Sequence, residues 1–137
     1  HVKNLFNILS FETIHQMVSE IHGQLKPKII ERDIIQALFP GGSITGAPKE
    51  RAMQIIDKIE LYERECYTGS IGFGFKNGNM DFNIAIRTII QHDKIGKYGV
   101  GGGIVWDSDF YSEWLEAHQK ALVLDQLIVG ELRIEKV

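Results

Sequence analysis

The sequence predicts an α+β fold in which an antiparallel sheet packs against helices. Apolar residues recur with helical spacing before residue 60 and again after residue 109, but they alternate with period two between about residues 70 and 105. An Asn-Gly pair divides the alternating region, as expected for a hairpin. A block of strands between helices is typical of the α+β class, whereas strands and helices in strict alternation would indicate a parallel sheet.

Two short helices are expected in the first half of the chain. Residues 11–25 fit a strand or a short helix, but residues 29–39 place apolar side chains on one helical face. Residues 40–48 break all periodicity and lead into a second helix, where a proline in the first turn and Thr45 as a cap mark the start. The apolar face of this second helix consists of Ala52, Ile55, Ile56 and Ile59.

A three-stranded antiparallel meander should follow these helices. Residues 70–75 and 80–87 alternate between apolar and small or polar side chains, and Asn77-Gly78 forms the turn between them. A second turn near residues 93–94 leads to a third strand at about residues 98–105. The antiparallel sheet is therefore expected to be continuous from the first hairpin to the third strand.

The composition is that of a globular chain of one domain. With 137 residues, 44% of them hydrophobic and 24% charged, the chain is long enough to bury a core and differs from disordered, collagen-like and coiled-coil sequences. Fifteen Lys and Arg residues against eighteen Asp and Glu residues leave a net charge of −3, which argues against nucleic-acid binding. The single cysteine, Cys66, cannot form an internal disulfide, and a lone thiol is not a zinc site.

We expect a cytoplasmic protein that is not exported and does not bind a membrane. One unpaired cysteine fits a reducing compartment, and the sequence has neither an uninterrupted apolar stretch of the roughly 20 residues that span a bilayer nor a signal-peptide core. Because patterned sequence begins almost directly after His1, we also expect the chain to be a piece of a longer polypeptide.

The hairpin register predicts a candidate carboxylate site around Arg87. If the first turn centres on Asn77-Gly78, Arg87 lies beside Tyr67, and the second turn places Arg87 opposite Val100, next to Gly101-Gly102-Gly103. A guanidinium, a phenol and strand N–H groups that no side chain screens would suit a small carboxylate. The same spacing also fits a solvated arginine beside a bulge.

A final long helix, from about Asp109 to Val129, has two stripes of different character. The apolar stripe comprises Tyr111, Trp114, Leu115, His118, Ala121 and Leu122, which indicates that His118 is packed in the core. The opposite stripe comprises Glu113, Glu116 and Lys120. Two glutamates three residues apart can share a Mg²⁺ ion, but a solvated helix face with a Glu116–Lys120 pair explains the same pattern.

Five segments of the sequence together resemble the C-terminal part of the chorismate-binding enzymes. They occur in the same order and span nearly the whole chain, from His15 to about residue 127. Their wording is most similar to the aminodeoxychorismate synthase component I (para-aminobenzoate synthase) branch of that family rather than to anthranilate synthase. The segments are Phe39-Pro40-Gly41-Gly42-Ser43-Ile44-Thr45-Gly46-Ala47-Pro48-Lys49, residues 67–72, residues 79–88, residues 101–108 and Glu113-x-x-Glu116-x-x-x-Lys120.

The resemblance implies a role for residues in each of these segments. Glu116 would bind Mg²⁺ directly and Glu113 would bind it through water, with the metal holding the ring carboxylate of chorismate and the catalytic Lys120 beside it. The enolpyruvyl carboxylate would be bound by Tyr67, Arg87 and the amides of Gly101, Gly102 and Gly103. His15 matches the family's active-site histidine, and Ser43 and Thr45 would shape the pocket wall.

The resemblance also implies a larger fold and a reaction. Residues 1–137 would be the C-terminal part of a chorismate-binding catalytic domain with the anthranilate synthase component I-like fold. Ammonia, supplied by a glutamine amidotransferase subunit or domain, would replace the C4 hydroxyl of chorismate and give 4-amino-4-deoxychorismate for 4-aminobenzoate and folate. The motif of the family's nucleophilic lysine and its other metal glutamates are not found in these residues, so we expect the chain alone to be inactive.

Two other interpretations remain open on the sequence. Anthranilate, isochorismate and salicylate synthases share the metal and carboxylate residues and differ in what attacks the ring and in whether pyruvate leaves. A non-catalytic module that binds a carboxylate or docks a partner would keep Arg87 and the glycines, but it would have no need of Glu113 and Glu116 on one stripe.

Overall fold

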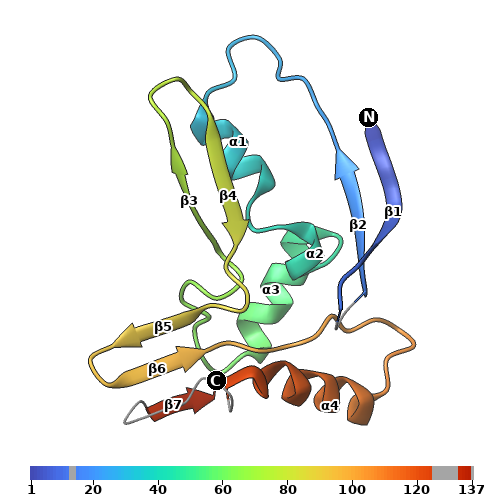
Figure 1. Cartoon of the computed structure of the whole chain (residues 1–137), viewed down its shortest axis with the longest axis vertical. Coiled ribbons are helices and arrows are strands. Elements are labelled where there is room, and N and C mark those ends of the chain that lie inside the picture. The colour runs from blue at the N-terminus through green and yellow to red at the C-terminus, as the bar shows by residue number, and fades with distance from the viewer. Residues whose placement is uncertain (13–14, 125–132, 137) are drawn as a thin grey trace. The chain divides into compact units, whose positions relative to one another are not determined.

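The computed structural model describes residues 1–12, 15–124 and 133–136. Its elements form two compact units, His1–Ala37 and Leu38–Val137. Figure 1 labels the helices and strands along the chain. Helices and small antiparallel sheets occur together, as the α+β prediction requires, and none of the helices in the described residues is both long and apolar enough to cross a membrane.

The first unit is a hairpin followed by a helix. Strand β1 (Val2–Ser10) pairs antiparallel with β2 (His15–Ile21), with irregular register near the start of β1. The segment that fits either a strand or a helix in the sequence thus forms a strand. Helix α1 (Glu31–Leu38) follows and confirms the helix expected at residues 29–39.

The second predicted helix is also present, but its start differs from the prediction. Helix α3 (Lys49–Ile59) has Pro48 as its N-cap residue. Thr45 does not cap it, because Thr45 ends a separate one-turn helix, α2 (Gly42–Thr45), and donates its hydroxyl to the carbonyl oxygen of Gly41 at 3.1 Å. A helix of four residues is too short to produce a periodic pattern, so the sequence did not indicate it.

The Asn-Gly hairpin exists with a register one residue from the expected one. Strands β3 (Ser70–Gly74) and β4 (Met80–Ile84) pair antiparallel, with Gly74 opposite Met80. The ladder closes with Phe75 N–H donating to Asn79 O at 2.7 Å, so three residues rather than two form the loop. Gly78 adopts φ 86°, the left-handed conformation that the last position of such a loop needs.

The continuous three-stranded meander is not present. Strand β4 ends at Ile84, and the chain turns at Arg87, which has φ 53°, before β5 (Ile89–His92) begins. Strand β5 pairs with β6 (Ile95–Tyr98) in a second sheet, where β7 (Arg133–Lys136) lies parallel to β6. Residues 99–105, expected as a strand, are all described and have no regular secondary structure. Four of these seven residues are glycines, which weaken a strand.

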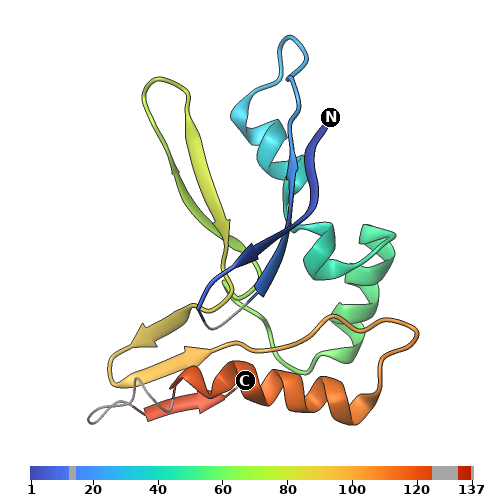
Figure 2. The same ribbon diagram turned by 45° about the vertical axis from the view of Figure 1, so that its right-hand side comes forward.

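Helix α4 (Phe110–Ala121) begins where the sequence predicts, and Val123 and Leu124, after a turn at Leu122, are again helical. Asp109 caps it by accepting hydrogen bonds from the backbone N–H and the hydroxyl of Ser112, both at 2.9 Å. Part of the predicted helix, residues 125–129, lies outside the described residues. In Figures 1 and 2, α4 runs alongside the segment that follows β6.

Most of the apolar stripe of α4 is exposed: Ala121 is its buried member, and the half-buried side chains include Glu113 and Lys120 of the polar stripe. Trp114 is 57% exposed and Leu115 45% exposed, while Glu113 and Lys120 are half-buried. His118, expected in the core, is exposed, and its Nδ1 lies 3.0 Å from the carbonyl oxygen of Trp114. Glu113 and Lys120 face inward because the backbone of the glycine-rich segment lies there, whereas Glu116 is exposed.

Candidate functional site

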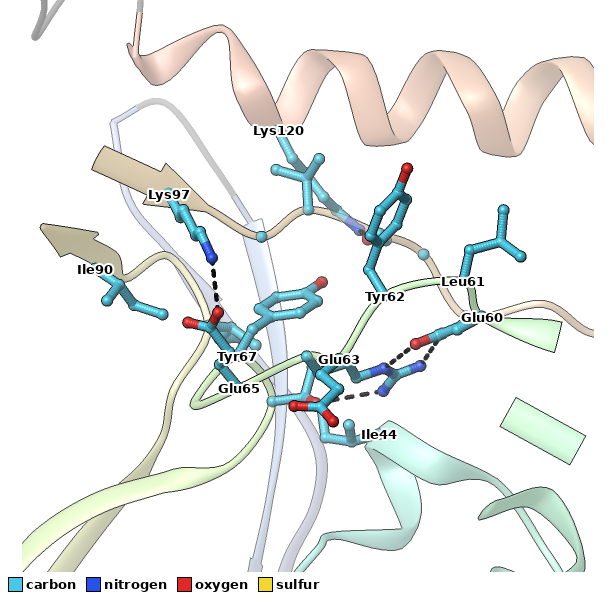
Figure 3. A pocket seen from close by; sticks show the side chains of 18 of the residues that line it. Ile44, Glu60, Leu61, Tyr62, Glu63, Glu65, Tyr67, Ile90, Lys97 and Lys120 are labelled. Carbon is cyan, nitrogen blue, oxygen red and sulfur yellow. Dashed lines mark hydrogen bonds and ion pairs between the residues drawn. The ribbon is translucent and has the colours of Figure 1, made fainter. Parts of the chain in front are cut away.

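A cavity of about 940 Å³ lies within the unit Leu38–Val137. Its walls are the loop of residues 60–68, the glycine-rich segment of residues 99–103 and the side of α4 around Lys120 (Figure 3). A second hollow of about 120 Å³ shares much of this wall and is lined by Tyr67, Ile86, Arg87, Gly99, Val100, Gly101 and Lys120. These walls contain most of the residues that the sequence singled out.

Tyr67 is held against the glycine-rich segment. A Cβ atom on Gly99 would lie 2.6 Å from Cδ2 of the Tyr67 ring, so no larger residue fits at position 99 without moving the ring. A Cβ atom on Gly101 would lie 3.2 Å from the Tyr67 hydroxyl oxygen, which places the phenol oxygen beside this backbone. Burial raises the pKa of Tyr67, with the cations Arg64 and Lys120 acting in the opposite direction. The phenol therefore stays protonated at neutral pH and remains a hydrogen-bond donor.

Arg87 reaches the same hollow from the connection between β4 and β5. The β3–β4 pairing continues past the strand ends, with Thr68 N–H donating to Ala85 O at 2.9 Å. This pairing brings the connection next to Tyr67, and Arg87 lines the smaller hollow with Tyr67 and Gly101. The sequence therefore predicted this neighbourhood correctly, although Arg87 lies in a turn rather than in a strand.

The polar stripe of α4 faces the glycine-rich segment. A Cβ atom on Gly102 would lie 2.9 Å from Oε2 of Glu113 and 3.9 Å from Oε1 of Glu116. Ser108 donates its hydroxyl to Glu113 Oε1 at 2.6 Å. The interpretation of this stripe as an ordinary solvated face is wrong for Glu113, which is half-buried among these groups.

Lys120 connects α4 to the same backbone. Its Nζ donates to the carbonyl oxygen of Gly101 at 2.8 Å and lies 2.6 Å from Glu116 Oε1. The hydrogen bond and positive charge of Lys120 lower the pKa of Glu116, so this carboxylate is ionised at neutral pH. The i,i+4 pair expected from the sequence is thus formed, and it lies beside the glycine-rich segment.

Glu113 and Glu116 are a donor set that fits Mg²⁺. Within the described ranges, no group of three or more His, Cys, Asp and Glu side chains is arranged to hold a metal ion. A closed site made only of protein ligands, such as a structural zinc site, is therefore not formed by these residues. Mg²⁺ is commonly held by one or two carboxylates and completes its shell with water and an anionic ligand. Glu113 and Glu116 do not line either cavity, but they lie next to Gly102, which is part of the larger cavity's wall.

The remaining predicted site residues are divided between the two units. Ser43, Gly102 and Gly103 line the larger cavity, whereas Thr45 is half-buried and is not part of its wall. His15 begins β2 in the other unit, where its Nδ1 lies 3.0 Å from the Ser10 hydroxyl oxygen. The active-site role expected for His15 stays a prediction.

Sequence reasoning missed the charged loop that forms one wall of the cavity. Arg64 donates from Nε to Glu60 Oε2 at 2.7 Å and from Nη2 to Glu60 Oε1 at 2.5 Å. Lys97 donates to Glu65 Oε1 at 2.7 Å (Figure 3). The i,i+4 spacing of Glu60 and Arg64 was a usable signal, but no local pattern relates Glu65 to a lysine 32 residues away.

The chain belongs to the chorismate binding enzyme family, whose pattern it matches over residues 1–125. It is 48% identical over 105 residues to "Aminodeoxychorismate synthase, chloroplastic" of Arabidopsis thaliana, covering 77% of this chain and 11% of the relative. It is 44% identical over 127 residues to "Aminodeoxychorismate synthase component 1" of Escherichia coli (strain K12), covering 92% of this chain and 28% of the relative.

A solved structure confirms the fold. Anthranilate synthase component I from Streptococcus pneumoniae TIGR4 matches with a TM-score of 0.79 and 35% identity, over 88% of this chain and 28% of that chain. The expectation of an α+β fold of the anthranilate synthase component I type is therefore confirmed. The chain spans no more than 28% of the length of any of these three relatives.

Proposed function

We propose that this chain forms part of an aminodeoxychorismate synthase, in which it is the C-terminal part of the catalytic domain. The observation that best supports the proposal is the convergence of Tyr67, Arg87 and the glycine-rich segment on one hollow, with two glutamates beside the same backbone. The two aminodeoxychorismate synthases that match at 48% and 44% identity favour this activity within the family.

In this proposal, the substrate chorismate is held by its two carboxylates. The protonated phenol of Tyr67, the guanidinium of Arg87 and the amides of Gly101 to Gly103 bind the enolpyruvyl carboxylate. Glu113 and Glu116 hold Mg²⁺, which supplies, when bound, the positive charge for the ring carboxylate. Lys120 keeps Glu116 ionised and orders the carbonyl of Gly101.

The reaction replaces the C4 hydroxyl of chorismate by ammonia and keeps the pyruvyl group, for 4-aminobenzoate and folate synthesis. We assign the ammonia supply to a glutamine amidotransferase subunit or domain; one relative is named component 1, which implies a further component. Residues 1–137 alone should not convert chorismate, because they contribute two metal carboxylates and no nucleophile. A cytoplasmic location is part of this proposal, although the Arabidopsis relative is named chloroplastic.

The first test is to identify the product by mass spectrometry. The full-length protein containing this chain would be mixed with chorismate, Mg²⁺ and ammonium, since free ammonia removes the need for a glutaminase partner. Aminodeoxychorismate with pyruvate retained would support the proposal. Anthranilate, isochorismate or salicylate would overturn the reaction assignment while keeping the binding roles.

Anthranilate synthesis is the second candidate reaction. The structural match is to an anthranilate synthase component I, and anthranilate synthase component 1 of Saccharomyces cerevisiae is 37% identical over 129 residues. These identities are lower than the 48% and 44% of the aminodeoxychorismate synthases, which is why we place this reaction second.

A non-catalytic binding module is tested separately, through the metal. In the full-length protein, Glu116→Ala should abolish the Mg²⁺ dependence of chorismate binding measured by calorimetry, because the carboxylate that this chain would contribute directly to the metal is lost. Glu50→Ala, which removes an exposed glutamate from α3 outside both cavity walls, serves as the control. Equal Mg²⁺-dependent binding in both variants would favour the module over the enzyme.

A further inference from the structure

The Arg64 side chain makes hydrogen bonds to two different residues. Besides the two hydrogen bonds to the Glu60 carboxylate, its Nη1 lies 3.3 Å from the Thr68 hydroxyl oxygen. The Arg64 side chain is 27% exposed. A bidentate Arg–carboxylate pair of this kind fixes the orientation of the guanidinium plane. A single contact between exposed charges does not.

These contacts join the two ends of the segment that contains Tyr67. Glu60 directly follows α3, and Thr68 lies two residues before β3, where its N–H donates to Ala85 O. Between them, the Tyr67 N–H donates to the Arg64 carbonyl oxygen at 2.9 Å, so the backbone and the side chain of Arg64 both restrain this segment. Thr68 itself has φ 66°, a conformation that a β-branched residue rarely adopts and that its surroundings must maintain.

Each of the three nitrogen atoms of the Arg64 guanidinium donates to Glu60 or Thr68, and the side chain also lines the larger cavity. The position of Arg64 matters because the segment it restrains carries Tyr67, whose phenol lies close to the glycine-rich backbone. A Cβ atom at Gly101 would lie 3.2 Å from the phenol oxygen. A small shift of the segment would move the phenol away from this backbone. The same segment has a second tie, from Glu65 to Lys97 on β6 (Figure 3).

We propose that Arg64, with Glu60 as its counter-ion, is a positioning residue that holds the phenol of Tyr67 in its binding orientation. This proposal rests on the proposed function only for the identity of the ligand. The arrangement of Tyr67 itself is independent of that function. The two parts are therefore tested by different measurements.

The first measurement is ¹⁹F NMR of the full-length protein with 3-fluorotyrosine at position 67 alone. A ring held against Gly99 should have a shift well separated from that of the free amino acid. Arg64→Met should remove more than half of that separation, Glu60→Gln should act in the same direction, and Arg64→Lys should restore part of it. Arg51→Met, the same change at an exposed position on α3, should have no effect. An unchanged Tyr67 signal in Arg64→Met would overturn the proposal, whatever the reaction proves to be.

The second measurement divides the kinetic effect into KM and kcat. Loss of ground-state binding by Tyr67 should raise the KM for chorismate about tenfold in Arg64→Met, with kcat within about threefold of the original. In a Tyr67→Phe background the same substitution should change KM less than twofold, since the hydroxyl it positions is gone. An equal increase of KM in both backgrounds would overturn the proposal, provided that thermal unfolding shows the variants to be folded. Absence of product in the unsubstituted protein would instead overturn the proposed function and leave the NMR result to decide the role of Arg64.

Discussion

Single glycines determine which side chains can approach the site. Gly99 leaves room for the ring of Tyr67, and Gly102 leaves room for the carboxylate of Glu113. At both positions glycine is favoured because it has no Cβ atom. Neither glycine has a positive φ, so the backbone conformation itself does not require glycine there. A residue pattern with an arginine, a phenol and a glycine run was visible in the sequence, and its members do meet. The contacts of Arg64 with Thr68 and of Glu65 with Lys97 were not visible, because nothing in the sequence specified how the loop of residues 60–68 would fold.

Gly99→Ala should destabilise the chain through its clash with Tyr67. We expect a loss of about 1–3 kcal/mol in the free energy of unfolding in urea, the usual cost of adding a methyl group to a filled space. Gly103→Ala is the matched control for stability, because a Cβ atom at position 103 would have no neighbour within 4 Å. In a Tyr67→Ala background the cost at position 99 should fall below about 0.5 kcal/mol. An undiminished cost there would show that the clash with the ring is not its cause.

The elements were predicted better than their connections. Helices α1, α3 and α4 and the β3–β4 hairpin all follow from periodicity, since each is long enough to show a pattern or has a turn signal. The break between β4 and β5 depends on the backbone at Arg87, and the pairing of β6 with β7 joins segments distant in the sequence. Neither is a local property. The inward face of α4 was misassigned for a related reason: hydrogen-bonding partners outside the helix, at Gly101 and Ser108, decide it.

The cap at Asp109 makes the stability of α4 depend on pH. Hydrogen bonds from Ser112, first from its backbone N–H and then from its hydroxyl, lower the pKa of the Asp109 carboxyl in the folded chain. The contribution of Asp109 to the free energy of unfolding is therefore fully present above the ordinary aspartate pKa. It is lost as the pH falls through the lowered pKa of Asp109 in the folded chain. At neutral pH, Asp109→Ala should lower the thermal midpoint by about 2–5 °C.

The pH series separates the cap from a general charge effect. The difference between Asp109→Ala and the original chain, followed by circular dichroism, should shrink towards zero as the pH is lowered below the range in which aspartates titrate. Asp107→Ala removes the same charge two residues earlier, outside the cap position, and should leave the midpoint nearly unchanged. A destabilisation by Asp109→Ala that is constant with pH would contradict the capping argument.

At the scale of the whole molecule, the apolar content exceeds what the described core buries. Hydrophobic residues make up 44% of the sequence, yet the buried apolar side chains within the described ranges are Ala85, Tyr98, Ala121 and Leu124. The sequence pattern correctly identified an apolar stripe on α4, but of its members Ala121 is buried whereas Tyr111, Trp114 and Leu115 are exposed. The composition indicates that this exposed apolar surface must be covered, but it does not indicate which other surface covers it.

The 137-residue chain studied alone should therefore self-associate through this stripe. Contiguous apolar surface of this kind is rare on stable monomers. Sedimentation velocity should show a mass that rises with concentration, and the double substitution Trp114→Gln with Leu115→Gln should shift the chain towards monomer and lower the binding of a hydrophobic dye. Gln119→Ala, which changes another exposed residue of the same helix, controls for changes in helix content. A monomer at all concentrations, or an association that the double substitution leaves unchanged, would mean that the exposed stripe of α4 is not the surface that drives contact between chains.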